Sequence, residues 1–446
     1  MRSWALASCL VWSGCATLLG INDTELGDAA VLGDADVGDA EPGDAEPDAR
    51  ADAGPNLCGN GLADPGEECD MGVRNDDNAP AGCTRACRRT ITWLTTRAST
   101  TFHAAYGVRA GPGGLAIAGA RLASPGVNEA WVMAMTAAGM ERWTRAYAGG
   151  TAESDNGYGA VVAADGRVVL SGSQDQASAT AGAAFVRGYD AAGAILFTNV
   201  YPITATTSGA GFDADLAPSG FVVAGLGRVS GTDTASLYLL SDSGGFSARI
   251  DSTLEGVSGN VARRVRALAD GYVYVGWGPG AATMSIDAYA RRIKAGSVLW
   301  TYRDPPLAGA ELAHGIDVCG DDTWVCGWNA QNAWIARLDA QGRARWRKDI
   351  VGAVPAQCAD VACAPDGSSI VVWDEPGATG FTHRARLRRY DGDGNVAWDR
   401  AVVNRGGVDA AMLLYSLDWV GDAVYTVGIE VPPSGATESV IRRYAP

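Results

Sequence analysis

The stretch AWIARLDAQGRARW, Ala333–Trp346, decides how this sequence is interpreted. An alternating run leads into a turn that contains Gly342, and a second short run ends on Trp346. Alternation at a period of two, interrupted by a glycine-containing turn, is typical of a β-hairpin. The stretch therefore predicts two short antiparallel strands.

The same hairpin returns about every 51 residues along the chain. Its turn glycines are Gly139, Gly193, Gly244, Gly296, Gly342 and Gly394. Four residues later stand Trp143, Phe197, Trp300, Trp346 and Trp398, and only the third copy departs, with Ala248. A buried tryptophan removes ~150–250 Å² from water. We therefore expect these aromatic residues, together with Trp93, to dock neighbouring repeats on one another and not to form a binding surface.

A second hairpin precedes each of these, with turns near Gly113, Gly166, Gly220, Gly271, Asp321, Gly367 and Gly421. Its second strand tends to end on a glycine: Gly119, Gly172, Gly225, Gly276, Gly327 or Gly428, with Trp373 in the sixth copy. Each period thus holds four short strands. Four strands in one period of this length predict a propeller blade.

The number of hairpins predicts how the ring closes. The hairpin that begins each repeat occurs seven times. In the last repeat the second hairpin is incomplete, because the sequence stops at Ser439–Pro446 after one of its two strands. The segment Thr90–Ser99, which contains Trp93, has no partner hairpin. We therefore expect an all-β, seven-bladed propeller over residues 90–446, with the N-terminal strand completing the last blade. Such closure removes a free sheet edge.

The spacing of Asp339, Gly342 and Trp346 resembles the repeat of quinoprotein propellers and of the outer-membrane assembly lipoproteins that share it. In that family the tryptophans dock neighbouring blades, in agreement with the expectation above. The count of seven departs from the eight blades usual there. The resemblance therefore extends to single hairpins and implies no quinone cofactor.

Residues 1–14 predict a signal peptide, because Arg2 precedes an apolar run too short to span a membrane. The sequence WSGC before and at Cys15 resembles a bacterial lipoprotein signal, although Trp12 stands where that family prefers Leu. The alternative box around Cys9 leaves too short an apolar region before it. The resemblance implies lipidation of Cys15, and Ala16 after it implies anchoring to the outer membrane.

Residues 15–56 form an acidic Asp/Ala/Gly/Pro segment. The net charge of the chain is −16, of which roughly −10 falls within Asn22–Asn56. A segment without aromatic residues cannot bury a core, so we expect a disordered linker. The rest of the chain is only mildly acidic, and a nucleic-acid partner is not expected because it requires a basic face.

Residues 57–89 contain Cys58, Cys69, Cys83 and Cys87 in the pattern CGNG…GEECD…GC…C. This resembles a disulfide-rich repeat of myxobacterial secreted proteins, although Met71 departs from the usual Asp. The stretch CATLLGINDTEL likewise resembles the N-termini of myxobacterial-type surface lipoproteins. The resemblance implies disulfides, with a zinc site as the alternative.

Four further cysteines lie in the fifth and sixth repeats: Cys319, Cys326, Cys358 and Cys363. Without Cys9 and Cys15 the chain has eight cysteines, an even number that favours disulfides in an exported protein. We expect the local pairs 319–326 and 358–363, with a link between blades as the alternative.

The sequence lacks HExxH, GxSxG and phosphate-loop motifs, and its three histidines, His103, His314 and His383, stand apart. No enzyme, metal site or cofactor is therefore expected. DGDGN, residues 391–395, looks like a calcium loop but occupies a turn position, and calcium remains the alternative there.

The connections between blades and between hairpins open on one face and are the longer ones, which makes that face the candidate binding face. We expect a non-catalytic envelope lipoprotein that presents its propeller as a protein- or glycan-binding module. One alternative is a glycan lyase or hydrolase in the axial funnel, which would require Asp, Glu, His or Tyr side chains to converge at its mouth. A lining of Gly, Ala and Ser would argue against it. The other alternative is a scaffold in envelope assembly.

Overall fold

The computed structural model describes residues 58, 70–71, 73, 75–76, 83, 85, 91–97, 102–124, 127–149, 154–175, 182–201, 209–229, 232–252, 259–280, 285–304, 310–329, 332–351, 356–376, 383–402, 412–431 and 437–446. The chain forms two units, Met1–Pro55 and Asn56–Pro446, and the described residues all belong to the second. The expected signal peptide, lipidated Cys15 and acidic linker lie outside the described residues, as does most of the cysteine-rich module. No helix in the described part of the chain is long and apolar enough to cross a bilayer.

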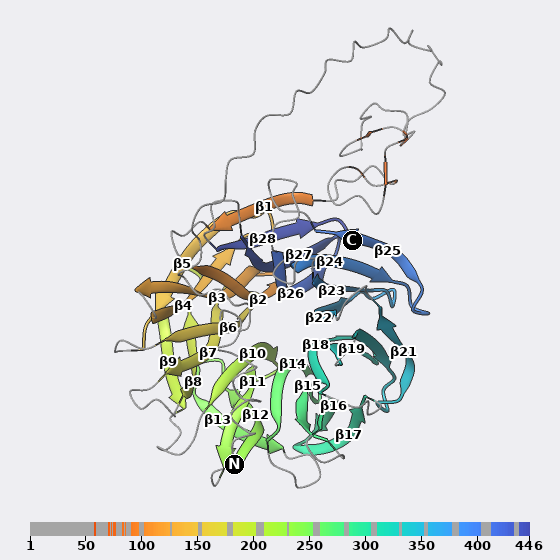
Figure 1. Cartoon of the computed structure of the whole chain (residues 1–446). Coiled ribbons are helices and arrows are strands. Elements are labelled where there is room, and N and C mark those ends of the chain that lie inside the picture. The colour runs from red at the N-terminus through yellow and green to blue at the C-terminus, as the bar shows by residue number, and fades with distance from the viewer. Residues whose placement is uncertain are drawn as a thin grey trace, which may run out of the picture. The chain divides into compact units, whose positions relative to one another are not determined.

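Seven four-stranded antiparallel sheets form the ring seen in Figure 1. In six of them the strands follow chain order from the axis outward, and in the seventh the last three strands of the chain are followed by its first strand. The first three blades are β2 (His103–Gly111), β3 (Gly114–Ser124), β4 (Val127–Met135), β5 (Glu141–Tyr147); β6 (Asp155–Val162), β7 (Val168–Asp175), β8 (Gly182–Tyr189), β9 (Ile195–Tyr201); and β10 (Ala210–Ala217), β11 (Gly220–Val229), β12 (Thr232–Leu240), β13 (Phe246–Ser252).

The next three blades are β14 (Val261–Leu268), β15 (Gly271–Pro279), β16 (Ile286–Lys294), β17 (Ser297–Arg303); β18 (Leu312–Cys319), β19 (Asp322–Trp328), β20 (Ala333–Leu338), β21 (Ala344–Ile350); and β22 (Gln357–Cys363), β23 (Ser369–Pro376), β24 (His383–Tyr390), β25 (Val396–Ala401). The seventh contains β26 (Met412–Val420), β27 (Ala423–Glu430) and β28 (Glu438–Tyr444). The prediction of a seven-bladed propeller is confirmed.

The N-terminal strand β1 (Ile91–Arg97) closes the seventh blade, as the count of hairpins predicts. It pairs antiparallel with β28, with Trp93 opposite Arg443. Arg443 Nη1 donates a hydrogen bond to Thr92 Oγ1 over 2.9 Å. Residues near the two ends of the propeller region thus complete one sheet.

The turn glycines of the repeat all have positive φ, between 74° at Gly342 and 86° at Gly139, the conformation that glycine adopts most readily. The side chain before each turn often caps it. Asp391 Oδ1 accepts hydrogen bonds from the backbone N–H of Asp393 and of Asn395 over 3.0 and 2.8 Å. The DGDGN segment is therefore a capped hairpin turn in this structure.

The repeated tryptophan and the repeated glycine are two halves of one contact between blades. Trp143 Nε1 donates to Ala191 O in the turn of the next blade over 3.0 Å. A Cβ atom on Gly193 of that turn would lie 2.7 Å from the Trp143 ring. Trp300 and Trp346 make the equivalent hydrogen bonds to Ala340 O and Gly392 O. The ring of one blade thus needs a residue without a side chain in the next.

The other aromatic residues of this series make different contacts. Phe197 lies against Gly244 of the third blade, where a Cβ would be 2.3 Å away. Trp398 is buried and stacks on Arg400, which donates a hydrogen bond to Ala445 O near the C-terminus. For Trp93 the structure describes the backbone position on β1.

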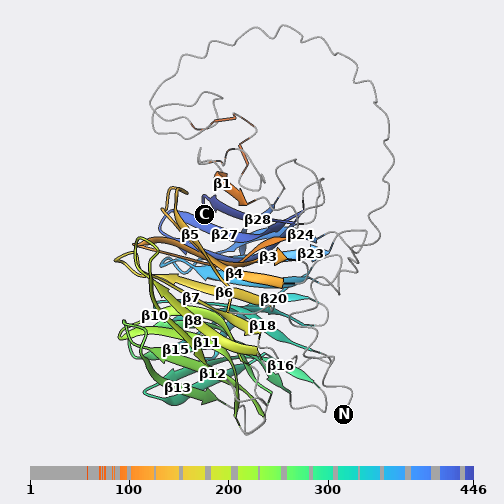
Figure 2. The ribbon, with the colours of Figure 1, turned by 90° about the vertical axis from the view of Figure 1, so that its left-hand side faces the viewer.

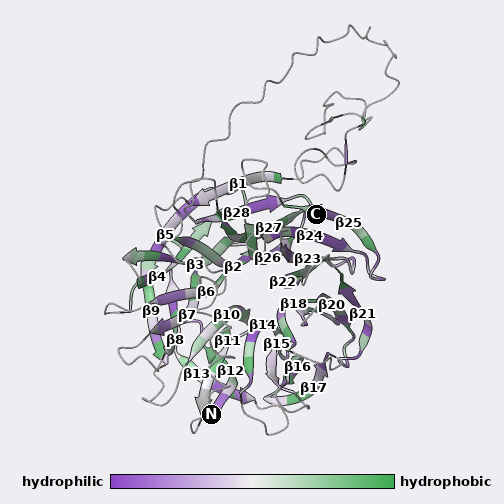
Figure 3. Ribbon diagram, in the orientation of Figure 1, coloured by the Kyte–Doolittle hydropathy of each residue, from purple (hydrophilic) through white to green (hydrophobic). Residues whose placement is uncertain are grey.

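Between neighbouring sheets lie seven hydrophobic clusters built from alternate strand residues. Figure 2 shows the sheets edge-on, stacked around the ring. Blade six carries Trp373 where most blades have a glycine on the second strand. The hydrophilic strand β24 in Figure 3 contributes Arg386 and Arg388, whose guanidinium groups lie 5.5 and 5.2 Å from the Trp373 ring centroid.

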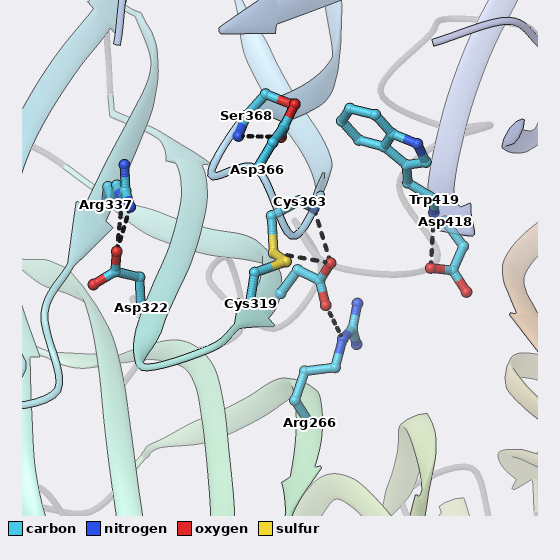
Figure 4. The surroundings of a disulfide bond; sticks show 10 residues. Arg266, Cys319, Asp322, Arg337, Cys363, Asp366, Ser368, Asp418 and Trp419 are labelled. Carbon is cyan, nitrogen blue, oxygen red and sulfur yellow. Dashed lines mark hydrogen bonds and ion pairs between the residues drawn. A yellow bond between two sulfur atoms is a disulfide. The ribbon is translucent and has the colours of Figure 1, made fainter. Parts of the chain in front are cut away.

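Two disulfides join the fifth and sixth blades, and the predicted local pairs are wrong. Cys319 bonds to Cys363 and Cys326 bonds to Cys358, with Cα–Cα distances of 6.1 and 5.9 Å. Figure 4 shows the first of these bonds beside Arg266. The expected alternative, a link between blades, is the one formed.

The geometry of strands explains this outcome. Cys358 and Cys363 lie on one strand, five positions apart, which separates them by about 16 Å. Cys319 lies opposite Asp322 and Cys326 opposite Gly315, so this pair is also offset along its hairpin. A disulfide requires Cα atoms within about 7 Å.

Candidate functional site

The inner strand of every blade contains a β-bulge at the same place. The shift in register falls after Ala105 in β2, and at the equivalent point in β6, β10, β14, β18, β22 and β26. The extra residues are Tyr106, Tyr158, Phe212, Arg263, His314, Ala359 and Tyr415. Bulges redirect side chains and are frequent next to functional sites. We call these seven residues the collar.

The second-strand glycines make room for the bulges. A Cβ atom on Gly119 would lie 2.0 Å from Ala104 O, and one on Gly276 would lie 1.8 Å from Val261 O. These glycines lie within their strands, because β3 continues to Ser124, so the prediction that the strand ends there is wrong. Each of these glycines therefore indicates a bulge on the neighbouring inner strand and not the end of its own strand.

The collar residues of neighbouring blades contact one another around the axis. Tyr106 lies between Tyr415 and Tyr158, with ring centroids 5.3 and 5.8 Å apart. Tyr158 continues to Phe212 at 5.8 Å, and the Arg263 guanidinium lies 5.3 Å from the Phe212 centroid. The collar therefore runs as a connected arc through the seventh, first, second, third and fourth blades.

The collar lies at the axial end that faces the longer connections. Each bulge is near the start of an inner strand, directly after the connection from the preceding blade. The short hairpin turns, such as the one between Gly111 and Gly114, lie at the other end of the same strands. The face that the sequence favours as a binding face is thus the face where the collar surrounds the axis.

Directly beneath the collar, a buried ion network crosses the axis. Arg264 of the fourth blade donates from Nη1 to Ser416 Oγ over 3.2 Å and from Nη2 to Tyr415 O over 2.9 Å, both in the seventh blade. Its Nη2 also lies 3.3 Å from Asp360 Oδ2 in the sixth blade. Arg264 is 3% exposed and Asp360 is 0% exposed, so this level of the axis is closed to solvent.

Asp213 of the third blade gathers three guanidinium groups. Arg109 Nη2 lies 2.7 Å from Asp213 Oδ2, and Arg266 Nη1 and Arg264 Nη1 lie 3.5 and 3.8 Å from its carboxylate. Burial alone would lower the pKa of Arg109, but Asp213 and further carboxylates raise it above its ordinary value. The network therefore remains charged although it is buried.

A second set of aspartates joins each inner strand to the next. Asp215 Oδ2 accepts from Ala267 N over 2.8 Å, and Asp317 Oδ2 accepts from Cys363 N over 2.9 Å. Asp418 Oδ2 accepts from Ala110 N over 2.7 Å and so links the last blade to the first. Burial raises the pKa of Asp215 to about 7 and those of Asp317 and Asp418 to about 6. These carboxylates thus titrate close to neutrality.

Asp317, Cys319 and Cys363 also form the one group of potential metal ligands among the described residues. The two sulfur atoms are bonded to each other, and Asp317 Oδ1 accepts a hydrogen bond from Arg266 Nε over 2.9 Å. Figure 4 shows this arrangement. The potential ligand atoms of this group are thus already engaged in a disulfide and in a hydrogen bond.

The described histidines differ in position. His103 begins β2 and packs on Trp131 with ring centroids 4.8 Å apart, whereas His314 is the collar residue of the fifth blade. Burial, Arg263 and Arg264 lower the pKa of His314 to about 3. His314 is therefore a neutral imidazole that packs edge-on against Trp277 at 5.8 Å. Histidine His383 begins β24, away from the axis.

Of the cysteine-rich module the structure describes isolated positions. Cys58 and Cys83 are each disulfide-bonded. Asp76 N donates to Cys83 O over 2.9 Å, and Asn75 Nδ2 donates to Asp70 Oδ1 over 2.8 Å. Cys69 and Cys87 lie outside the described residues.

No protein-family model and no curated protein matches this sequence. Among solved structures, it is similar to an acylaminoacyl peptidase from Pyrococcus horikoshii, with 9% identity and a TM-score of 0.40 over 64% of this chain and 45% of that one. A prolyl endopeptidase is 12% identical with a TM-score of 0.41, over 75% and 48%. The β-propeller domain of the trilobed protease from Pyrococcus furiosus is 9% identical with a TM-score of 0.43, over 80% and 96%.

These similarities show the fold alone, and this chain spans about half the length of the first two proteins. They nevertheless correct one prediction. The sequence predicts a protein that is not an enzyme, whereas the solved structures with this fold include peptidases. Among the described residues, the collar consists mainly of aromatic and basic side chains, with Ala359 as its one small residue, and does not match the Gly, Ala and Ser lining that would argue against an enzyme. The exclusion of catalysis is therefore wrong.

Proposed function

We propose that this chain is a cell-envelope lipoprotein whose propeller binds a glycan at the collar. The observation that carries the proposal is the collar itself, which gathers Tyr106, Tyr415, Arg263 and His314 at one end of the axis. These four are half-buried, whereas Tyr158 and Phe212, which lie between Tyr106 and Arg263 in the collar, are 5% and 4% exposed. The Arg264 network beneath them supports a closed site in preference to an open channel.

A compact aromatic site suits a sugar better than a protein partner. Specific protein interfaces cover about 800 Å² on each partner, far more than a few side chains around one axis offer. Tyrosine combines an apolar ring with a polar hydroxyl. A sugar ring presents apolar C–H faces and polar hydroxyl edges, which match that combination.

The proposed anchor is a lipid on Cys15. Mass spectrometry of the mature N-terminus is expected to find an acylated cysteine at this position, and Cys15→Ser is expected to release the protein from the membrane fraction. Cys9→Ser is the matched control and is expected to leave anchoring intact. An unmodified mature N-terminus would contradict this part of the proposal.

Glycan binding is tested with the purified full chain on a panel of immobilised bacterial polysaccharides. Tyr106→Ala and Tyr415→Ala are expected to reduce binding roughly tenfold or more, since each removes a stacking surface. Phe246→Ala is the control, because Phe246 is an aromatic residue on β13 that is 54% exposed and far from the axis. Equal losses in all three variants, or binding to proteins alone, would contradict the proposal.

The second candidate is an enzyme that acts on a glycan at the same mouth. This candidate would depend on the imidazole of His314 and the hydroxyl of Tyr106 within one collar, since side chains of these types can move protons. Incubation of oligosaccharides with the chain, followed by chromatography, tests for cleavage. His314→Gln is expected to abolish turnover and His103→Gln to preserve it. Intact substrate after long incubation would leave the binding function and remove this candidate.

A further inference from the structure

We propose that the glycan bound at the collar is an acidic one, recognised through the carboxylate of a uronic-acid-type sugar. This inference rests on the proposed function and adds the chemical class of the ligand. It follows from the distribution of aromatic and charged groups around the axis.

The aromatic side of the collar provides the platform for the sugar ring. Tyr415, Tyr106, Tyr158 and Phe212 are consecutive, and their rings are tilted by 59°, 50° and 41° from one to the next. The rings are therefore inclined to one another and do not form a flat stack. The half-buried members, Tyr106 and Tyr415, supply the accessible surface.

One cation, Arg263, stands at the end of the aromatic arc. Arg263 follows Phe212, and Arg264, the next residue in the chain, crosses the axis directly beneath. No collar residue is acidic. Asp213 and Asp360 lie at the level below, where they contact Arg109 and Arg264 and also act electrostatically on Arg263.

Two titratable collar groups have lowered pKa values, chiefly because of burial and secondly because of neighbouring guanidinium groups. Burial and then Arg264 lower the pKa of Arg263 to about 10. Burial, Arg263 and Arg264 lower the pKa of His314 to about 3. A negative charge brought to the collar would offset the contribution of the guanidinium groups, and arginine offers the paired N–H donors that a carboxylate accepts.

Other ligands with a ring are less compatible with these groups. Aromatic clusters can hold quaternary ammonium ions, but Arg263 would repel a cation here. A nucleotide would also combine a ring with an anion. The disulfides Cys319–Cys363 and Cys326–Cys358 favour an oxidising compartment, where acidic polysaccharides are plentiful and nucleotides are scarce.

The test compares matched ligands on the full chain by isothermal titration calorimetry. The probes are oligogalacturonate, its methyl ester and a neutral galactose oligosaccharide of equal length, with a nucleoside monophosphate as a further arm. We expect oligogalacturonate to bind roughly tenfold or more tightly than its ester, because a charge-assisted hydrogen bond is lost. Its affinity is expected to fall as salt rises.

Variants locate the carboxylate. Arg263→Gln is expected to bring the acidic and esterified ligands to similar affinity, while Arg249→Gln on β13, whose partner is Asp251, changes neither. Thermal melting confirms that both variants fold. Should Arg263→Gln fail to fold, the comparison of acid with ester on the unaltered chain still decides the matter.

Three results would overturn the inference. Equal binding of acid, ester and neutral sugar would preserve glycan binding and remove the preference for a carboxylate. Tighter binding of the nucleotide than of the uronate would replace the ligand class. Absence of binding to every sugar on the polysaccharide panel would remove both this inference and the proposed function.

Discussion

Arg264 Nη1 donates a hydrogen bond to Ser416 Oγ over 3.2 Å and so joins the inner strands of the fourth and seventh blades across the propeller axis. These residues are 152 positions apart in the chain. The contact converts a ring that could enclose a channel into a ring with a closed centre. It also places a guanidinium group directly below the collar.

Replacement of Arg264 by Met tests the importance of this crossing. The substitution leaves Asp360 buried with one cation fewer, and removing one partner of a buried ion pair costs about 3–5 kcal/mol. We expect a lower midpoint in urea-induced unfolding with an unchanged slope. Arg249→Met, at an exposed pair with Asp251, is expected to change stability by less than about 1 kcal/mol. A midpoint like that of the unaltered chain would show that the network is dispensable.

Asp215 predicts how stability depends on pH. Its pKa is raised from 3.8 to about 7 by burial, so the folded chain holds this proton more tightly than the unfolded chain does. The contribution to the free energy of unfolding is therefore fully present below about pH 4 and is lost as pH rises through 7. Asp317 and Asp418, raised to about 6, act in the same direction.

We accordingly expect Asp215→Asn to be more stable than the unaltered chain at pH 8 and to weaken the decline between pH 5 and pH 8. Thermal melting at a series of pH values measures this. Asp422→Asn removes the same charge from a side chain that is 94% exposed and is the control. An identical pH dependence for both variants would contradict the assigned role of Asp215.

The disulfides predict a redox dependence of stability. They close segments with sequence separations of 44 and 32 residues, and a native disulfide of this kind contributes about 2–4 kcal/mol. We expect Cys326→Ser/Cys358→Ser to lower the urea midpoint and to leave Cys319–Cys363 intact in peptide mapping. A mixed variant, Cys319→Ser/Cys326→Ser, removes one cysteine from each bond. If it retained a 358–363 bond, the pairing described above would be wrong.

The docking tryptophans predict a graded loss of stability. Trp143→Phe removes the hydrogen bond to Ala191 O and is expected to cost about 1 kcal/mol. Trp143→Ala also removes the packed ring and is expected to cost about 3–5 kcal/mol. Phe246→Ala, on an exposed position, is expected to change little. Chemical unfolding monitored by circular dichroism gives the three values, and equal losses for Phe and Ala at position 143 would contradict the packing argument.

Local sequence patterns suffice to predict the individual hairpins of this fold. The turn glycines, such as Gly342, and the alternating strands around them act over a few residues, so their periodicity predicts each hairpin. Gly119 predicts a strand end in the sequence, but this prediction is wrong because the glycine is required by the carbonyl of Ala104 on the neighbouring strand. A glycine required by a partner strand has no distinguishing feature in its own segment.

By itself, the sequence determined the repeat, the number of blades and the pairing of β1 with β28, because these depend on hydrophobic alternation and on counting strands. Only the tertiary structure decided which cysteines bond and which side chains meet at the axis. Arg264 and Ser416 become neighbours because seven sheets converge on one line, and no periodicity within a single blade encodes that meeting. The collar arises in the same way, from one bulge per blade brought together by closure of the ring.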